Sequence, residues 1–434
     1  MVISRSEIMP GVGLTYLHSD KFKTACMSIN LLCQLKRETA SMNALVPFVL
    51  RRGTSRYGDM EALSRRMNEL YGTGIEPAVR RIGEIQCVGF YASFPESAFL
   101  PDKTDLLGET AALMGQLLLS PATRGGLLLP DYVDSEREKM AEDIRSIIND
   151  KRGYATKRCM EEMCCFEDFA VGRMGSEDDC ENINYKKLSR RYKELLQQSP
   201  IEVFYCGAAG EKAVRRALKD ALVTLPRGEI DYDIGTDVRM NAVEDKPRFV
   251  EEQMDVTQGK LVMGFRLGEV MEDPDPAALH VFNSVFGGSS SSKLFMNVRE
   301  KLQLCYYASS GINIPKGLML VSTGIEFDKL EAAQNEIFAQ LEEMKKGNIS
   351  ESELNAARSG VASDLRAVMD SQGALEGFYL SQTLMGLDYG PMEMAELAGQ
   401  VTAADVARIA NSVECDLIYF MSGSDSEEDE NGED

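Results

Sequence analysis

Two side chains late in the sequence have the types and the spacing that peptide chemistry requires. In the segment VREKLQLCYY (298–307), Arg299 is expected to close a helix and Tyr306 to begin a strand. A cation and a phenol that converge at such a corner can hold a peptide carbonyl, or the oxyanion formed from it, by charge-assisted hydrogen bonds. The alternative is structural, with Arg299 in a surface salt bridge and Tyr306 packed at the start of the strand.

The stretch before this corner is rich in glycine and serine. Gly287, Gly288 and Ser289 begin a run that continues to Ser292. The run lacks the Lys-Ser/Thr ending of a phosphate-binding loop, and a helix rather than a strand is expected before it. It therefore predicts a flexible turn whose serines cap the next helix, or else a hinge or a substrate-binding loop.

Metal and nucleophile chemistry have little support in the sequence. The two histidines, His18 and His280, lie far apart, so the HExxH and HxxEH motifs are absent. The ten cysteines include no CxxC pair, and the cysteines between 159 and 165 lack the paired second cluster of a zinc site. No G-x-S-x-G motif occurs in a strand–turn–helix context.

Apolar periodicity predicts two similar halves of strands and helices. Strands are expected at 25–35, 84–94, 259–268, 305–312 and 317–325, and helices at 43–50, 58–70, 131–148, 275–286, 293–301 and 329–344. Antiparallel strands covered by helices make an α+β fold. The predicted division is a first domain at 1–225, a polar linker at 226–248, a second domain at 249–421 and a tail at 422–434.

Composition limits the class of partner and the compartment. The formal net charge of −22 opposes binding to nucleic acid or to an anionic membrane. The stretch 422–434 carries seven acidic residues and no basic residue, which is typical of a disordered, solubilising tail. No signal segment or membrane span is expected, and scattered cysteines in apolar runs are typical of a reducing compartment. A cytoplasmic protein is expected.

The segment 286–310 closely resembles the second-domain signature of the M16 (insulinase-like, pitrilysin-type) metallopeptidases. The matching residues are Phe286-Gly287-Gly288-Ser289 through Ser292, Lys293-Leu294-Phe295, Val298-Arg299-Glu300-Lys301, and Tyr306 with Ala308-Ser309-Ser310. Gln303 stands where the family usually has glycine. The resemblance extends along most of the chain and implies two tandem homologous domains, each an antiparallel sheet covered by helices (the LuxS/MPP-like metallohydrolase fold).

The first half resembles the family in outline but not in its metal chemistry. Active members carry HxxEH in a helix before a Gly-Thr pair, which is Gly53-Thr54 here. The motif positions then fall on Ala44, Leu45, Val46, Pro47 and Phe48, so that Ala44 and Phe48 replace the two histidine ligands and Pro47 replaces the general base. The position of the third ligand falls on Asp143. No metal is expected in this chain, because zinc needs about three protein ligands.

The resemblance implies a function shared with a second chain. In some bacterial members one chain carries HxxEH and the other carries only the Arg–Tyr pair, and this sequence is most similar to the zinc-less members found beside a zinc-bearing paralogue in Gram-positive bacteria. The first hypothesis is therefore a subunit that is inactive alone and complements a zinc-bearing partner in peptide hydrolysis, with Arg299 and Tyr306 as catalytic residues. Peptide would bind by strand addition along the edge 75–81. The substrate-binding residues would be Ile75, Glu76, Ala78, Arg80, Gly287, Gly288 and Ser289.

A second hypothesis remains open. Related core subunits of respiratory complexes keep this scaffold without peptidase activity. The chain would then be a non-catalytic structural or peptide-binding protein, alone or as a homodimer. An unrelated enzyme activity is the third possibility.

Overall fold

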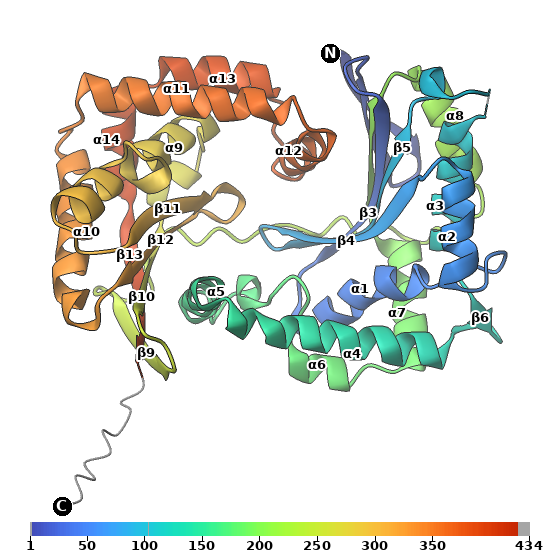
Figure 1. Cartoon of the computed structure of the whole chain (residues 1–434), viewed down its shortest axis with the longest axis horizontal. Coiled ribbons are helices and arrows are strands. Elements are labelled where there is room, and N and C mark those ends of the chain that lie inside the picture. The colour runs from blue at the N-terminus through green and yellow to red at the C-terminus, as the bar shows by residue number, and fades with distance from the viewer. Residues whose placement is uncertain (1, 103, 424–434) are drawn as a thin grey trace, which may run out of the picture. The chain divides into compact units, whose positions relative to one another are not determined.

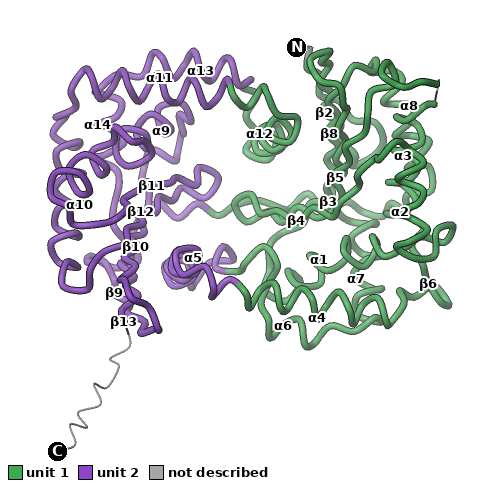
Figure 2. Tube along the Cα trace, viewed as in Figure 1, with its two compact units in different colours: residues 1–146, 171–237, 367–389 green, residues 147–170, 238–366, 390–434 purple. Residues whose placement is uncertain are grey.

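The chain forms two compact units, each built around one β-sheet (Figure 1, Figure 2). The computed structural model describes residues 2–102 and 104–423. Unit 1 comprises Met1–Ser146, Val171–Asp237 and Ala367–Tyr389, and unit 2 comprises Ile147–Ala170, Val238–Arg366 and Gly390–Asp434. Each unit therefore contains one segment from the opposite half of the sequence, an exchange that the periodicity does not predict.

Unit 1 contains a six-stranded sheet. All neighbouring strands are antiparallel except β2 and β8, which are parallel. The strands in spatial order are β1 (Val2–Met9), β2 (Val12–His18), β8 (Ile201–Gly207), β3 (Thr24–Gln34), β5 (Ile85–Pro95) and β4 (Gly74–Ile82). The strand β4 is thus an edge strand. A separate two-stranded ribbon pairs β6 (Thr123–Arg124) with β7 (Leu127–Leu128).

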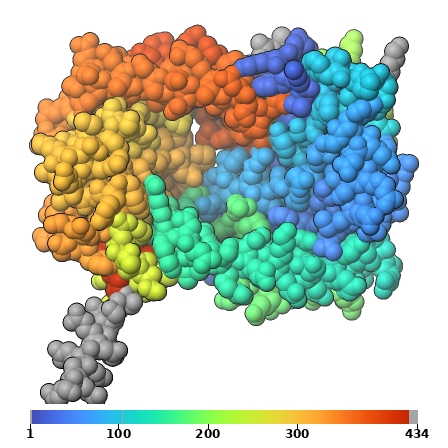
Figure 3. All heavy atoms as spheres, in the orientation of Figure 1, coloured from blue at the N-terminus to red at the C-terminus, as the bar shows by residue number. Residues whose placement is uncertain are grey.

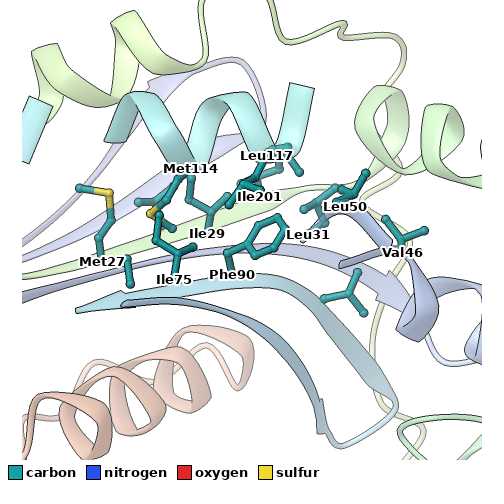
Figure 4. Packing of buried hydrophobic residues seen from close by; sticks show 14 of the residues in the cluster. Met27, Ile29, Leu31, Val46, Leu50, Ile75, Phe90, Met114, Leu117 and Ile201 are labelled. Atoms are coloured by element: carbon teal, nitrogen blue, oxygen red, sulfur yellow. The ribbon is translucent and has the colours of Figure 1, made fainter. Parts of the chain in front are cut away.

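Helices cover both faces of this sheet. The helices of unit 1 are α1 (Arg37–Leu50), α2 (Met60–Glu69), α3 (Leu106–Leu119), α4 (Pro130–Ser146), α6 (Glu177–Glu181), α7 (Tyr185–Gln198), α8 (Glu211–Ala221) and α12 (Gln372–Leu384). The main core lies between the sheet and helices α1 and α3, where Ile29 and Phe90 meet Val46, Leu50 and Met114 (Figure 4). By contrast, α12 packs on β3 and β8 through the smaller apolar cluster of Leu17, Cys26, Phe204, Cys206 and Leu375. The helix α4 is largely exposed, as the teal-green band in Figure 3 shows.

Unit 2 contains a five-stranded sheet. Its strands in spatial order are β11 (Tyr307–Asn313), β12 (Leu318–Ile325), β10 (Gly259–Arg266), β13 (Glu414–Gly423) and β9 (Arg248–Met254). Only β13 and β9 run parallel. The predicted acidic tail, 422–434, lies outside the described residues apart from Ser422 and Gly423, which end β13.

Helices also cover the sheet of unit 2. They are α5 (Lys151–Met163), α9 (Pro276–Asn283), α10 (Leu330–Lys345), α11 (Glu351–Val368, whose last two residues belong to unit 1), α13 (Pro391–Gln400) and α14 (Ala403–Ser412). Phe265 of β10 packs edge-on against Phe338 of α10, with ring centres 6.4 Å apart. Helix α5 packs on β10 and β13, and Cys159 and Met163 of α5 join Val262 and Tyr419 in an apolar cluster.

The fold is α+β, as predicted, because sheets rich in antiparallel pairs carry helical layers. Helix starts follow the sequence locally. Asp105, Asn184 and Asp275 each accept a backbone N–H bond at the beginning of a helix, which satisfies one of the donors that a helix leaves free. Within the described residues, no helix has the length and apolar character needed to cross a bilayer.

One predicted helix has a different geometry. Residues 294–301 form a π-helix, η6 (Leu294–Lys301), and a second π-helical stretch, η5, covers Ser284–Gly288. The wider turn is closed by a bond of 3.1 Å from the N–H of Leu302 to the carbonyl of Asn297, five residues earlier. It keeps Leu294 and Val298 buried while Arg299 stays partly exposed. Such π-helical turns often occur at functional sites.

Candidate functional site

Arg299 and Tyr306 line one pocket in unit 2. Helix η6 carries Arg299, and Tyr306 is the residue before β11. The backbone N–H of Tyr306 donates to the carbonyl of Gly324 on β12 over 2.8 Å, which fixes the start of the strand. The pocket has a volume of about 370 Å³, and its remaining lining residues are Glu300, Gln303, Leu304, Cys305 and Glu326. The structure thus brings together the pair that the spacing singles out.

Both polar groups of the pair remain accessible. The Tyr306 residue is 60% exposed. The Arg299 side chain is 41% exposed and lies 3.6 Å, from Nε to Oε1, from Glu300. Its guanidinium carbon sits 4.7 Å from the centre of the Phe295 ring, which orients the group by a cation–π contact. Cys305 also lines the pocket, and burial raises the pKa of its thiol to about 11 although Arg299 opposes the shift, so this thiol is protonated at neutral pH.

Gln303 forms the corner between the two residues, and its backbone is left-handed. Its φ angle is 51°, a region that glycine adopts without a steric penalty. The N–H of the next residue, Leu304, donates to the carbonyl of Val298 over 3.0 Å and closes the corner. This geometry gives a physical reason for the glycine that the family usually has at this position.

Replacing Gln303 with glycine is expected to raise the free energy of unfolding of unit 2 by up to about 1 kcal/mol, because the left-handed strain is removed. Gln303→Val should lower it by about 1–2 kcal/mol, because a branched Cβ fits this region poorly. Urea titrations measure both changes, and Gln303→Ala serves as the control that keeps a Cβ without branching. Equal stabilities for the Gly and Val variants would show that the corner is unstrained.

The glycines before η6 serve close packing. A Cβ on Gly287 would lie 2.7 Å from the backbone nitrogen of Ser310 on β11, and a Cβ on Gly288 would lie 2.6 Å from the side-chain nitrogen of Asn283. Ser289 Oγ donates to the carbonyl of Ser284 over 3.0 Å. Gly287 thus lets the turn approach β11 closely, whereas Gly288 and Ser289 pack against residues just before them in the chain. A direct role of Gly287, Gly288 and Ser289 in substrate binding stays a prediction.

The positions aligned with the metal motif lie on α1 within an apolar core. Ala44, Leu45 and Val46 are at most 5% exposed, Pro47 is buried, and Phe48 packs against the same core. Methyl groups and a proline ring offer zinc no lone pair, so the donor set does not fit the ion. Among residues 2–102 and 104–423, no group of three or more His, Cys, Asp or Glu side chains is placed to hold a metal.

An ion pair joins the end of this helix to α4. Arg52, just beyond α1, donates to Glu136 Oε1 over 2.8 Å, and its guanidinium carbon lies 4.9 Å from the centre of the Tyr132 ring. Asp143, which the resemblance aligns with the third ligand, lies about two turns after Glu136 on α4. No histidine occupies the motif positions on α1 that would complete a zinc site with it. The guanidinium of Arg52 thus links the end of α1 to α4.

The predicted peptide-binding strand is the edge strand β4, but its edge is partly occupied. Arg51 Nε donates to the carbonyl of Ile75 over 2.6 Å, and Arg173 Nη1 donates to the carbonyl of Val79 over 3.3 Å. Pro77 has no N–H to offer a partner strand. Two strand carbonyls are therefore already bonded to side chains of unit 1.

The four candidate residues of β4 have different surroundings. Ile75 is fully buried and Ala78 is 8% exposed, whereas the Glu76 side chain is 71% exposed and lies 3.7 Å from an Arg51 nitrogen. Arg80 forms an ion pair with Glu376 of α12, whose side chain is fully buried. Glu376 therefore compensates the positive charge of Arg80.

Sequence reasoning missed two buried polar networks. In unit 1, Glu376 accepts hydrogen bonds from Ser28 Oγ (2.8 Å) and Asn30 Nδ2 (3.3 Å) in addition to its ion pair with Arg80. The only local signal is an acidic residue in the middle of the apolar stretch 374–380. A carboxylate in that context needs a buried partner, but the pattern does not say which one.

The second network ties the segment Ile147–Ala170 into unit 2. Glu167 accepts from Arg266 (2.6 Å) and lies 2.7 Å from Lys316 Nζ, and Arg266 Nε donates to Asp416 over 2.8 Å. All four side chains are at most 5% exposed. Arg248 reaches the same Asp416 at 3.1 Å. Burial alone would raise the pKa of Glu167, but the hydrogen bonds from Arg266 and Lys316 outweigh it and lower that pKa.

The fold, the Arg–Tyr pocket and the apolar α1 together are those of a metallopeptidase-like scaffold that lacks the metal-binding side chains on α1. Residues 182–361 match the domain described as "Peptidase M16 inactive domain". The chain is also 31% identical over 417 residues to a protein of Bacillus subtilis named "Probable inactive metalloprotease YmfF", covering 95% of this chain and 96% of that one. The chain belongs to the M16 peptidase family and is an inactive metalloprotease homologue.

Solved structures agree on the fold. A conserved protein from Enterococcus faecalis V583 superposes with a TM-score of 0.87 at 25% identity, covering 97% of this chain and 99% of that chain. A peptidase M16 inactive domain from Pseudomonas fluorescens gives a TM-score of 0.79 at 14% identity over 98% and 99% of the two chains, a likeness that concerns the fold alone.

Proposed function

We propose that this chain complements a zinc-bearing M16 partner in peptide hydrolysis and supplies Arg299 and Tyr306 to the shared site. The observation that carries the proposal is the pocket in unit 2, where a guanidinium and a phenol line one cavity and both remain exposed. There they can donate hydrogen bonds to a peptide carbonyl and to the oxyanion that replaces it. Zinc would come from the partner, because α1 offers no ligands.

The division of labour follows from what each part of the chain can do. A zinc ion activates water for attack on a carbonyl, and the apolar side chains of α1 cannot hold that ion. A pair of donors at the carbonyl remains useful when another chain supplies the activated water.

The ten cysteines are free thiols, and this fits a reducing compartment such as the cytoplasm.

Reconstitution tests the proposal. The chain is mixed with an HxxEH-bearing M16 paralogue from the same organism, and hydrolysis of unstructured fluorogenic peptides is measured. Both chains should be needed for activity. The proposal fails if the mixture hydrolyses no peptide faster than the paralogue alone.

One observation favours the alternative of a non-catalytic structural or peptide-binding protein, alone or as a homodimer. Arg51 and Arg173 occupy two carbonyls of the edge strand β4, so a peptide that adds to this edge must first displace them. Sedimentation of the isolated chain, with and without the same peptides, separates the two candidates. A stable homodimer that ignores the paralogue supports the structural role.

A further inference from the structure

Two cysteines face each other across the sheet of unit 1. Cys26 on β3 is paired directly with Cys206 on the antiparallel strand β8, and both residues are fully buried. Directly opposed residues of an antiparallel pair have Cα atoms about 4.5–5.5 Å apart. Disulfides need about 4.4–6.8 Å between Cα atoms. The backbone therefore already has the separation that a disulfide requires.

The two thiols also contact each other. A side-chain hydrogen bond between them raises the pKa of Cys26 and lowers the pKa of Cys206. The contact thus stabilises a thiolate within the pair, and the thiolate is the reactive form of cysteine.

Helix α12 covers the pair. Gln372, the first residue of α12, donates from Nε2 to the carbonyls of Thr24 (2.8 Å) and Cys206 (3.0 Å), and its own carbonyl lies 4.0 Å from Cys26 Sγ. About one turn later, Leu375 belongs to the same apolar cluster as both cysteines. An oxidant can reach the sulfur atoms only after this end of α12 leaves the sheet.

We propose that Cys26 and Cys206 form a redox modification site, which a hydroperoxide converts into a cross-strand disulfide when α12 moves off the sheet. The ion pair between Glu376 and Arg80, together with the bond from Ser28, holds α12 in place. These contacts set how often the dithiol is exposed. The site is separate from the Arg299–Tyr306 pocket of unit 2.

The reaction balances with one hydroperoxide. The thiolate of one cysteine attacks an oxygen of ROOH, the O–O bond breaks, and ROH leaves as a sulfenic acid forms. The second thiol attacks that sulfur, the S–O bond breaks, and water leaves. In total, two thiols lose two electrons and two protons, and ROOH is reduced to ROH and water.

The same sheet contains a matched control pair. Cys33 on β3 and Cys87 on β5 are also buried, but Cys33 is paired with Gln86 and Cys87 with Leu32. The two cysteines are therefore offset by one residue and point to opposite faces of the sheet. They cannot form a disulfide without a change of register.

Oxidation of the full-length chain with hydrogen peroxide tests the site, with exposed Cys165 as the internal check that the oxidant acts. Mass spectrometry of the unreduced digest should show a peptide pair joined through Cys26 and Cys206, two hydrogens lighter and released by dithiothreitol. Cys206→Ala should abolish this product. Complete oxidation of Cys165 without any Cys26–Cys206 product would overturn the proposal.

The covering role of α12 has its own readout. Glu376→Gln removes the charge that holds Arg80 and should speed disulfide formation about tenfold, while alkylation of Cys33 in the same sample, which reports opening of the main core, should not accelerate. If disulfide formation and Cys33 alkylation accelerate equally, the variant has only destabilised unit 1 and the role of α12 is refuted. An unchanged rate of disulfide formation would refute it too.

Discussion

Tyr306→Phe is expected to lower turnover about 100-fold in the complex with a zinc-bearing partner, with little change in KM. The substitution removes only the hydroxyl, and the loss of one donor to a developing oxyanion typically reduces kcat by about 100- to 1000-fold. Steady-state hydrolysis of an unstructured peptide measures the effect. The matched control is Tyr232→Phe in unit 1, at a tyrosine that is 66% exposed and outside the pocket.

Substitution of Arg299 should also lower turnover of the complex, because the side chain contributes a positive charge and a forked pair of donors. Arg299→Met is expected to lower turnover about 100-fold or more. Arg299→Lys should recover only part of it, because an ammonium cannot reproduce the two-pronged contact. The side chain is partly exposed and stacks on Phe295, so neither variant should unfold unit 2. Full turnover in Arg299→Met and Tyr306→Phe alike would disprove the assigned roles.

Glu167→Gln is expected to destabilise unit 2 by about 3–5 kcal/mol, because it leaves Arg266 and Lys316 as buried cations without their shared carboxylate. Thermal or urea unfolding at neutral pH measures the loss. Glu177→Gln is the surface control, because its partner Arg145 is 63% exposed at the side chain, and pairs of that kind contribute little.

The pH dependence gives this prediction a second readout. The pKa of Glu167 is lowered in the folded chain, whereas the pKa of a glutamate in the unfolded chain is about 4.3. The stabilisation is therefore complete above that value and is lost as the pH falls through the lower folded pKa. The difference in stability between wild type and Glu167→Gln should shrink in this acidic range. A difference that stays constant below about pH 4 would show that the carboxylate charge is not the cause.

Local patterns in the sequence predict strands β3, β5, β10, β11 and β12, helices α1, α2, α4, α9 and α10, and the corner that joins Arg299 to Tyr306. They do not predict strands such as β1, β2, β8, β9 and β13, or helices such as α3, α5, α7, α8 and α11 to α14. The predicted features depend on periodicity and on a separation of a few residues, which one sequence contains. Family resemblance adds the edge position of β4 and the replacement of the metal ligands on α1. The left-handed backbone of Gln303 was not predicted, although the glycine that is usual at this position in the family is the signal that could have indicated it.

The missing parts depend on residues far apart in the chain. Arg80 and Glu376 are separated by 296 positions, and Arg266 and Asp416 by 150. No local pattern encodes which buried charge meets which partner. For the same reason, the sequence does not predict that α12 packs in unit 1 and α5 in unit 2. A helix has an apolar face whichever sheet it covers. The π-helical turns were not predicted, because their apolar spacing is close to that of an α-helix.

Titration of this chain into a fixed amount of a zinc-bearing M16 paralogue tests the central claim most directly, with peptide turnover and bound zinc measured together. The proposed division of labour predicts that the isolated chain holds no stoichiometric zinc and hydrolyses nothing. It also predicts that turnover rises until one chain is present per zinc ion. Full turnover by the paralogue alone, or zinc-dependent hydrolysis by this chain alone, would contradict it.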